Sequence, residues 1–296
     1  MYMKLLITGS NGQLGSEVKK ILKSKRTELG PIPDIFLSAC IDCVDVEELD
    51  ITNKEAVLVY VKKSEPNIII NCAAYTNVDD CEDNINSAFL VNAIGARNMA
   101  IVAEKVNAKL VHISTDYVFA GDGNKPYQEF DIPNPKSIYG ASKNMGEQYV
   151  RDFCTRYYIV RTAWLYGYVG KNFVKTIMKV GHDTGSLKVV NDQVGNPTNA
   201  VDLAHHILKI AAKEEYGIYH CTGIGECTWF DFASKIIEYA GIKANISPCT
   251  TDEYQRTAMR PAYSALDNTM LRCTIGDEMR TWQEALKCFI KNYNQK

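Results

Sequence analysis

A tyrosine and a lysine four residues apart, Tyr139 and Lys143, form a pattern in this sequence that could carry out chemistry. In a helix, positions four apart lie on one face with Cβ atoms about 5–6 Å apart. An ammonium beside a phenol favours the phenolate and lowers the phenol pKa from about 10, so the phenol could exchange a proton near neutral pH. A hydroxyl such as that of Thr115 on the same substrate oxygen would complete a proton-transfer site for a carbonyl or an alcohol.

A second tyrosine–lysine pair, Tyr239 and Lys243, has the same spacing but a different context. It straddles Gly241, and glycine is a poor residue for a helix interior. We therefore interpret the second pair as a helix end. The pair at Tyr139 follows an apolar run that ends in Ser114 and Thr115, which is the context that proton transfer needs.

The glycines at the start of the chain, Gly9, Gly12 and Gly15, follow the apolar run 3–8. Apolar residues then recur with helical spacing from Leu14 onward, which predicts a helix directly after the glycines. Such a strand–turn–helix unit lets the backbone approach a pyrophosphate and directs the positive end of the helix dipole at it. The turn therefore predicts a dinucleotide site.

Apolar runs and helical patterns then alternate along the chain. We predict strands over 35–41, 68–74, 109–114 and 158–161, with helices over 53–63, 87–106 and 139–153. This alternation indicates an α/β protein with a Rossmann-like, doubly wound parallel sheet. Ligands of such sheets bind at the carboxyl ends of the strands, where Gly9, Ala73 and Thr115 all fall.

The regular strand–helix rhythm weakens after residue 163. We predict that residues 1–163 and about 199–222 form a dinucleotide-binding domain. The segments at about 164–198 and 223–296 are then expected to form a smaller substrate-binding part that is interleaved with the sheet.

The composition of the 296 residues is that of a soluble globular protein, with 46% hydrophobic residues, 23% charged residues and a net charge of −2. This charge balance predicts no broad basic surface for nucleic acid. No apolar run reaches the roughly eighteen residues of a membrane span, so we expect a cytoplasmic protein. The ten cysteines are scattered, and the pair Cys40 and Cys43 has no second pair at zinc spacing, so no metal site is predicted. We expect the adjacent His205 and His206 to lie on the surface or to pack rather than to bind a ligand.

Several longer motifs carry a family resemblance over nearly the whole chain. They are Gly9-x-x-Gly12-x-x-Gly15, Asn71-Cys-Ala-Ala-Tyr-Thr-Asn-Val-Asp79, Ser114-Thr-Asp-Tyr-Val-Phe119, Tyr139-Gly-x-x-Lys143, Arg161-Thr-Ala-Trp164, Asn191-Asp-Gln-Val-Gly-x-Pro-Thr198 and Arg260-Pro-x-x-Ser-x-Leu266. With these motifs the chain resembles the extended short-chain dehydrogenase/reductases, and within them it is similar to the dTDP-4-dehydrorhamnose reductases.

The resemblance implies roles for individual residues. It implies that Tyr139 protonates the C4 keto oxygen of dTDP-4-dehydro-L-rhamnose while hydride arrives from a nicotinamide, that Thr115 hydrogen-bonds the same oxygen, and that Lys143 holds the nicotinamide ribose. The cofactor contacts that it implies are Gly9, Gly12, Gln13, Leu14, Gly15, Asp50, Ile51, Ala73, Ala74 and Tyr75, and the substrate contacts are Asp116 and Trp164. The product would be dTDP-L-rhamnose, a precursor of cell-surface polysaccharide, and the family is compatible with a homodimer.

The role of Arg260 stays open between three alternatives. An arginine suits bidentate binding of the substrate pyrophosphate. A contact that closes the cleft and a plain salt bridge fit its position in the sequence as well.

The residue after Asp116 distinguishes reduction from dehydration. Sugar-nucleotide 4,6-dehydratases, which look similar, carry Thr-Asp-Glu where this chain has Thr115, Asp116 and Tyr117. Without the second carboxylate the elimination lacks its base, so carbonyl reduction is favoured. Two other functions fit the same fold: a nucleotide-sugar epimerase, and a non-catalytic regulatory subunit of methionine adenosyltransferase.

The choice between NADH and NADPH depends on the groups around the adenosine ribose. A 2′-phosphate calls for a basic residue near the glycine turn or the end of the second strand, and the chain has none between Arg26 and Lys54. Asp42 or Asp45 is placed to bind a ribose hydroxyl instead. The residues therefore favour NADH, whereas the family is commonly described with NADPH.

Overall fold

Six parallel strands form the centre of the protein in this computed structural model, which describes residues 3–294. Across the sheet they are β12 (Gly217–His220), β7 (Tyr157–Thr162), β6 (Lys109–Thr115), β5 (Ile68–Asn71), β1 (Lys4–Thr8) and β4 (Cys40–Val44). Each strand pairs in parallel with its neighbours. The chain order reverses between β1 and β5, and ligands of such sheets bind beside this reversal. The predicted Rossmann-like doubly wound sheet is confirmed.

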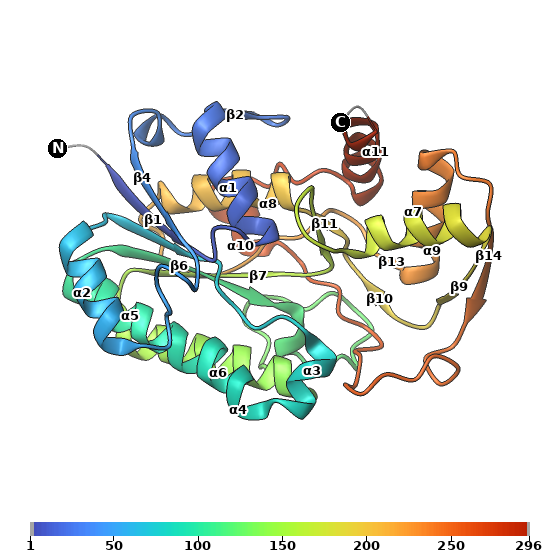
Figure 1. Cartoon of the computed structure of the whole chain (residues 1–296), viewed down its shortest axis with the longest axis horizontal. Coiled ribbons are helices and arrows are strands. Elements are labelled where there is room, and N and C mark those ends of the chain that lie inside the picture. Colours follow the sequence, from blue (N-terminus) through green and yellow to red (C-terminus); the bar gives the residue numbers. More distant parts are fainter. Residues whose placement is uncertain (1–2, 295–296) are drawn as a thin grey trace.

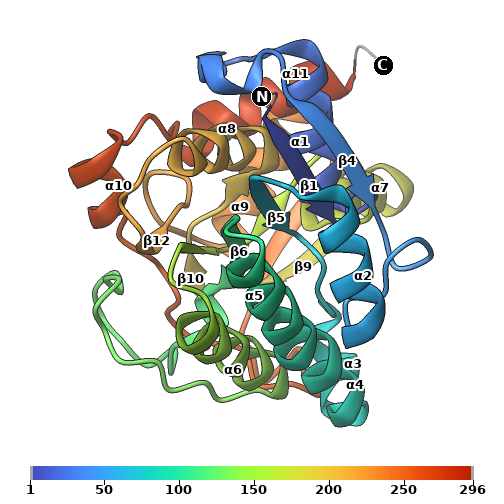
Figure 2. The same cartoon turned by 90° about the vertical axis from the view of Figure 1, so that its left-hand side faces the viewer.

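Helices cover both faces of the sheet (Figure 1, Figure 2). One face carries α1 (Gln13–Ser24) and α8 (Ala200–Ala211), and the other carries α2 (Lys54–Ser64), α5 (Ala96–Lys105) and α6 (Ile138–Phe153). Because both faces are covered, the central strands are apolar on both sides. Side chains alternate along β5 between the two cores, with Ile68 and Ile70 in one and Ile69 in the other.

A third, aromatic core lies beyond the carboxyl ends of the sheet strands, to the right in Figure 1. It is built from α7 (Phe173–Thr184), α9 (Trp229–Ala240) and α11 (Trp282–Tyr293), with the parallel pair β9 (Ser186–Val190) and β14 (Asn245–Cys249). The shorter elements are β2 (Arg26–Thr27), β3 (Gly30–Pro31), α3 (Val78–Asp83), α4 (Ile85–Phe89), β8 (Leu165–Tyr166), β10 (Val194–Gly195), β11 (Thr198–Asn199), β13 (Cys227–Thr228) and α10 (Thr269–Thr274), with 3-10 turns at Asp34–Phe36 and Asp116–Val118.

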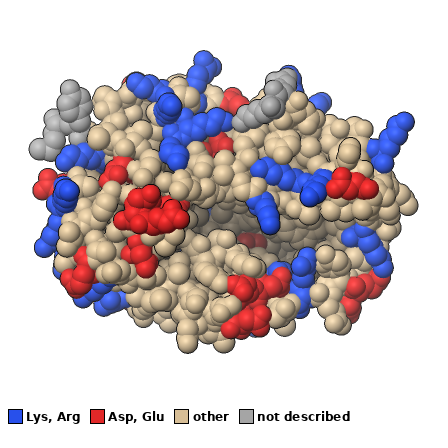
Figure 3. Space-filling view, viewed as in Figure 1, with Lys and Arg blue, Asp and Glu red and all other residues tan. Residues whose placement is uncertain are grey.

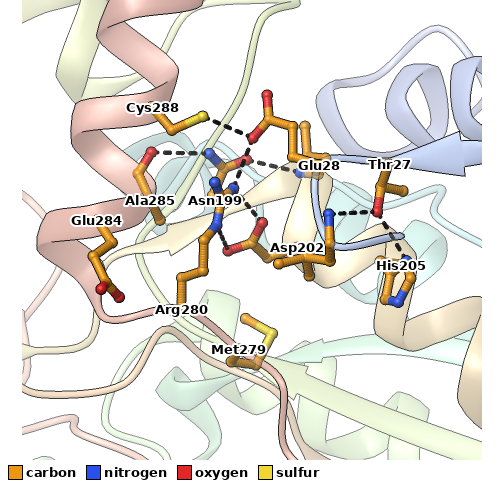
Figure 4. Close-up of polar contacts among 12 residues, drawn as sticks. Thr27, Glu28, Asn199, Asp202, His205, Met279, Arg280, Glu284, Ala285 and Cys288 are labelled. Carbon is orange, nitrogen blue, oxygen red and sulfur yellow. Dashed lines mark hydrogen bonds and ion pairs between the residues drawn. The ribbon is translucent and has the colours of Figure 1, made fainter. Parts of the chain in front are cut away.

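Arg280, which lies just before α11, joins this C-terminal helix to α8 and to the turn between β2 and β3 (Figure 4). Its Nε donates to Asp202 Oδ2 on α8 at 3.0 Å, and its Nη2 lies 3.0 Å from Glu28 Oε2 in the turn between β2 and β3. The thiol of Cys288 on α11 donates to the same carboxylate at 3.0 Å. These contacts hold the helix that closes the aromatic core against the face of the sheet that α1 and α8 cover.

The predicted second strand over 35–41 is wrong in its position. The chain forms a 3-10 turn at Asp34–Phe36, and β4 begins at Cys40, which pairs with Lys4. Phe36 is buried while Ile35 and Leu37 are exposed. A short apolar run does not reveal its own secondary structure, and here the pairing with β1 selects the later segment.

Other local predictions hold. Helix α9 ends at Ala240, and Gly241 caps it in the left-handed region with φ +66°, so the pair of Tyr239 and Lys243 is indeed a helix end. His205 and His206 are buried in α8, where they bond to the Thr27 hydroxyl and the Asp202 carbonyl. Within residues 3–294, none of the helices is long and apolar enough to cross a membrane.

Candidate active site

A cleft of about 810 Å³ lies at the carboxyl ends of the sheet strands, between the sheet and the aromatic core. Figure 3 shows the hollow across the middle of the molecule, with basic side chains along its upper rim. The predicted site residues that line it are Gly9, Gly12, Gln13, Leu14, Asp50, Ile51, Ala73, Ala74, Tyr75, Thr115, Asp116, Tyr139, Lys143 and Trp164. Residues that the sequence places up to 155 positions apart are thus brought to one cavity.

The glycine turn has a shape that side chains would destroy. Gly9 has φ +63°, and a Cβ there would lie 2.7 Å from the backbone nitrogen of Ala73. A Cβ on Gly15 would lie 2.3 Å from the carbonyl oxygen of Gly9, so Gly15 allows α1 to pack directly on the turn. Gly12 precedes the helix, and the first N–H groups of a helix have no intrahelical partner. This cradle fits a dinucleotide pyrophosphate.

Asn92 positions the segment 73–75 that follows β5. Its side chain accepts from the backbone N–H of Tyr75 at 2.8 Å and donates to the Tyr75 carbonyl at 3.0 Å. It also donates to the hydroxyl of Ser142 on α6 at 3.0 Å. Asn92 lies in a π-helical stretch, Leu90–Gly95, and such bulges often mark functional sites. The Asn92 amide therefore fixes the segment 73–75 relative to α6, the helix that carries Tyr139 and Lys143.

Thr115, Tyr139 and Lys143 meet in the cleft. Thr115 ends β6, and its hydroxyl lies close enough to the Tyr139 phenol to lower the pKa of that phenol. Lys143 lies one turn further along α6, is 2% exposed, and donates from Nζ to the carbonyl of Ile113 at 2.6 Å. Ser137 caps α6 by accepting the N–H of Gly140 at 3.1 Å, which sets where the helix begins.

The expected lowering of the Tyr139 pKa is wrong for this structure. Burial raises the pKa of the Tyr139 phenol above its ordinary value, and the Thr115 hydroxyl only partly opposes this shift. Burial also lowers the pKa of Lys143 to about 8. Desolvation is the largest cause of both shifts, so the phenol stays protonated at neutral pH and can act as a proton donor.

Asp116 and Tyr117 extend the site beyond Thr115. Burial raises the pKa of Asp116 to about 6, and the Thr115 hydroxyl donates to its Oδ1 at 2.9 Å. The ring of Tyr117 packs edge-on against the Tyr139 ring, with centroids 5.5 Å apart. Tyr117 therefore packs on the Tyr139 ring at the position where a dehydratase would carry a carboxylate.

Trp164 lies in a strained backbone conformation, with φ +46°. Its ring stacks on Trp229 at 3.5 Å between centroids, and a Cβ on Gly195 would lie 2.5 Å from it. Trp229 also lines the cleft, and sequence reasoning missed it because it lies 65 positions away and opens α9 like an ordinary core residue. Non-glycine residues at positive φ cluster at functional sites.

Gln13 has a bridging position that the sequence did not reveal. Its Nε2 donates to the Leu165 carbonyl at 3.0 Å, and its Oε1 accepts from Asn172 at 2.9 Å. Asn172 caps α7, so the glycine turn is hydrogen-bonded directly to the first helix of the aromatic core. Lys171, beside Asn172, lines the cleft as well.

Two predicted site residues lie elsewhere: among residues 3–294, the lining of the cleft includes neither Gly15 nor Arg260. Gly15 packs behind the turn. Arg260 donates from Nη2 to Asp79 Oδ2 at 2.8 Å and lies beside the Tyr117 phenol. Because Asp79 belongs to α3, this ion pair fastens the irregular segment after β14 to the sheet side of the cleft. Within the same described range, no three histidine, cysteine or acidic side chains group as metal ligands do.

The fold and the site define an oxidoreductase of the extended short-chain dehydrogenase/reductase class. The chain belongs to the family described as RmlD substrate binding domain, whose model matches residues 3–295. The predicted resemblance and the prediction of an enzyme are both confirmed by this membership and by the relatives below.

Three relatives illustrate the similarity. A dTDP-4-dehydrorhamnose reductase of Aggregatibacter actinomycetemcomitans is 39% identical, with 96% of this chain and 97% of that protein covered. The crystal structure of a dTDP-4-dehydrorhamnose reductase from Clostridium acetobutylicum is 48% identical with a TM-score of 0.93, covering 99% and 100% of the two chains. That of the Bacillus anthracis reductase in complex with NADP is 44% identical with a TM-score of 0.92 and the same coverage.

Proposed function

We propose that the protein reduces the C4 keto group of dTDP-4-dehydro-L-rhamnose to give dTDP-L-rhamnose, with NADH or NADPH as the hydride donor. The observation that carries this proposal is the meeting of Thr115, Tyr139 and Lys143 in the cleft that also contains the glycine turn. The names of the reductases that are 39–48% identical over nearly their whole length support the choice of substrate.

Three residues of the chain would donate the proton, orient the acceptor oxygen and stabilise the charge that is left. Tyr139 donates its phenolic proton to the C4 oxygen, since its raised pKa keeps it protonated at neutral pH. Thr115 would turn its hydroxyl proton from Asp116 Oδ1 to the same oxygen and hold it beside the phenol. Lys143 provides a positive charge next to the phenolate that remains, which stabilises the charge that develops during transfer. When bound, the nicotinamide supplies the hydride to the C4 carbon, so one C–H and one O–H bond form.

The cofactor would lie along the residues of the cleft nearest the glycine turn. Gly9, Gly12, Gln13 and Leu14 would hold its pyrophosphate, and Asp50 and Ile51 its adenine. Ala73, Ala74 and Tyr75 would line its other half, with Lys143 on the nicotinamide ribose. Asp116 and Trp164 would contact the sugar nucleotide, with Trp229 behind Trp164. Arg260 would close the cleft through Asp79 instead of touching phosphate, and Gly15 would act by shaping the turn.

Asp45 makes NADH the preferred cofactor in this proposal. It follows β4, lines the cleft, and accepts the N–H of Asn11 in the glycine turn at 2.9 Å. Asp42 is engaged elsewhere, with both carboxylate oxygens on the Tyr60 hydroxyl. A carboxylate at the end of this strand binds a ribose hydroxyl and repels a 2′-phosphate. Lys19, 3.4 Å from the Asn11 side chain, offsets part of that repulsion, so NADPH should also be accepted.

The substitution Asp45→Ser tests this preference. We expect the ratio of kcat/KM with NADH to that with NADPH to fall by about tenfold, because one like-charge contact near the surface is worth on the order of 1.4 kcal/mol. Glu47→Ser, which removes an exposed carboxylate from the same loop, is the matched control. An unchanged ratio in the Asp45 variant would remove Asp45 from cofactor selection.

The pH profile of the reduction should follow Lys143. Its pKa is lowered to about 8, so the ammonium predominates below that pH and is lost above it. We expect kcat/KM with the keto sugar to be level from about pH 7 to pH 8, above the pKa of Asp116, and to fall about tenfold per unit above pH 8, while Tyr139 stays protonated throughout. A stopped assay across pH 6–10 measures it, and a level profile to pH 10 would contradict the role given to Lys143.

The oxidation of NADH or NADPH by dTDP-4-dehydro-L-rhamnose tests the proposed function itself. We expect loss of the reduced-nicotinamide absorbance in proportion to the sugar added. An epimerase would instead consume no added cofactor, and denaturing the protein would release one tightly held dinucleotide per chain. A homodimer and a cytoplasmic location remain predictions from the sequence.

A further inference from the structure

Helix α6 carries a third functional group on the face that presents Tyr139 and Lys143. Glu147 lies four residues beyond Lys143, as Lys143 lies four beyond Tyr139. Side chains at this spacing are neighbours on a helix. Glu147 is 2% exposed, so its carboxylate is held inside the protein, one turn of α6 beyond Lys143.

Three hydrogen bonds fix this carboxylate. Arg161 on β7 donates from Nε to Glu147 Oε1 at 2.9 Å and from Nη2 to Oε2 at 2.6 Å. Ser114 on β6 donates its hydroxyl to Oε1 at 2.5 Å. Ser114 and Arg161 are register partners in the sheet, and Ser114 directly precedes Thr115. The carboxylate thereby joins α6 to the strand end that carries the Thr115 hydroxyl.

The other groups that face Lys143 are neutral at physiological pH. The Ile113 carbonyl on β6 accepts its proton. The Cys72 thiol, after β5, has its pKa raised to about 12 by burial. The His112 ring on β6 has its pKa held well below the ordinary value by burial and by Lys143. Among these neighbours Glu147 supplies the negative charge, and it opposes the desolvation that lowers the pKa of Lys143.

We propose that Glu147 is a positioning residue for the reaction assigned above: its fixed carboxylate keeps Lys143 in the ammonium form, and through Ser114 it holds the strand end that presents Thr115. This inference rests on the proposed function for its catalytic meaning. The electrostatic effect on Lys143, however, is a property of the protein with any ligand that contacts the ammonium. A purely structural ion pair between Glu147 and Arg161 would leave the titration of Lys143 where it is.

The test removes the Glu147 carboxylate together with the Arg161 guanidinium, so that neither is left buried alone. Of this pair, Glu147 is the charge that acts on Lys143. Glu147→Gln by itself would strand the Arg161 guanidinium, which is strongly destabilising, whereas replacing both members of a buried pair by apolar residues is often tolerated. The main variant is therefore the double substitution Glu147→Met with Arg161→Met. Glu147→Asp keeps both charges and is the second variant, in case the double variant does not fold. Glu104→Gln, which removes an exposed carboxylate from α5, is the control.

The measurement is the pH dependence of NADH binding, followed by the fluorescence of the bound nicotinamide, with kcat/KM recorded in parallel. In the double variant we expect the fall at alkaline pH to begin about one pH unit lower than in the wild type. Glu147→Asp should show a smaller displacement in the same direction, and Glu104→Gln none. The thermal midpoint of each variant reports on folding separately.

Two outcomes overturn the inference. One is a double variant in which NADH binding falls at the same alkaline pH as in the wild type, while affinity or turnover is lowered equally at every pH. The other applies where only Glu147→Asp folds: NADH binding in that variant then falls at the same pH as in the wild type. Because NADH binding needs no sugar, the titration remains informative even if dTDP-4-dehydro-L-rhamnose is not turned over, and that failure would count against the proposed function alone.

Discussion

We expect Tyr139→Phe to lower kcat for the keto sugar by about 10²- to 10⁴-fold, the usual contribution of a positioned general acid. In the proposed reaction the phenol gives the proton, and burial keeps it protonated at neutral pH. Phenylalanine keeps the ring and its edge-on contact with Tyr117. The affinity for NADH, measured by fluorescence titration, should therefore stay within a few-fold of wild type.

The chain supplies its own control for this substitution. Tyr239 and Lys243 repeat the spacing of the proposed pair, yet they stand at the end of α9, separated by the helix cap Gly241. Tyr239→Phe should leave kcat unchanged. Turnover near the wild-type level in Tyr139→Phe would show that Tyr139 is not the proton donor, whatever the control shows.

The second large effect is expected at the glycine turn. In Gly15→Ala the new Cβ would lie 2.3 Å from the Gly9 carbonyl oxygen and 2.7 Å from Ser10 Cα. Both contacts are with backbone, so α1 must move away from the turn. Overpacking of this kind costs about 1–3 kcal/mol. Because NADH binds at this turn in the proposed function, we expect the Kd for NADH to rise by about 10- to 100-fold. Calorimetry or fluorescence titration measures this Kd.

Gly185→Ala separates this steric effect from a general loss of stability. Gly185 caps α7 with φ +66°, and a Cβ there meets nothing within 4 Å. Alanine in a left-handed cap costs about 1 kcal/mol of stability. Its thermal midpoint should fall while its NADH affinity stays unchanged, and equal affinities in the two variants would contradict the role given to Gly15.

Much of the fold was predictable because its signals are local. The glycine turn with its flanking strand and helix, the apolar strands β5 and β6, and the spacing in α6 all follow from residues that are neighbours in sequence. From these signals the sequence predicts that the glycine turn, the segment after β5 and Tyr139 lie in one region, as they do in the cleft. The position of β4 was not predictable, since the pairing of Lys4 with Cys40 chose it over the apolar run just before.

What the sequence could not supply depends on contacts between distant segments. The stack of Trp164 on Trp229 and the bond from Asn172 to Gln13 join residues 65 and 159 positions apart. The direction of the Tyr139 pKa shift was also missed. The sequence shows the ammonium at the correct spacing, but it does not show that both groups are desolvated, and desolvation is the largest cause of both pKa shifts.

The central claim is that Tyr139, Thr115 and Lys143 deliver a proton to a ketone oxygen as hydride reaches its carbon. The most direct test supplies NADH deuterated at the transferred position of the nicotinamide, with dTDP-4-dehydro-L-rhamnose as substrate, and locates the label in the product by NMR. One deuterium is expected at C4 of dTDP-L-rhamnose for each NADH oxidised. An unlabelled sugar, with the added NADH left intact, would contradict it.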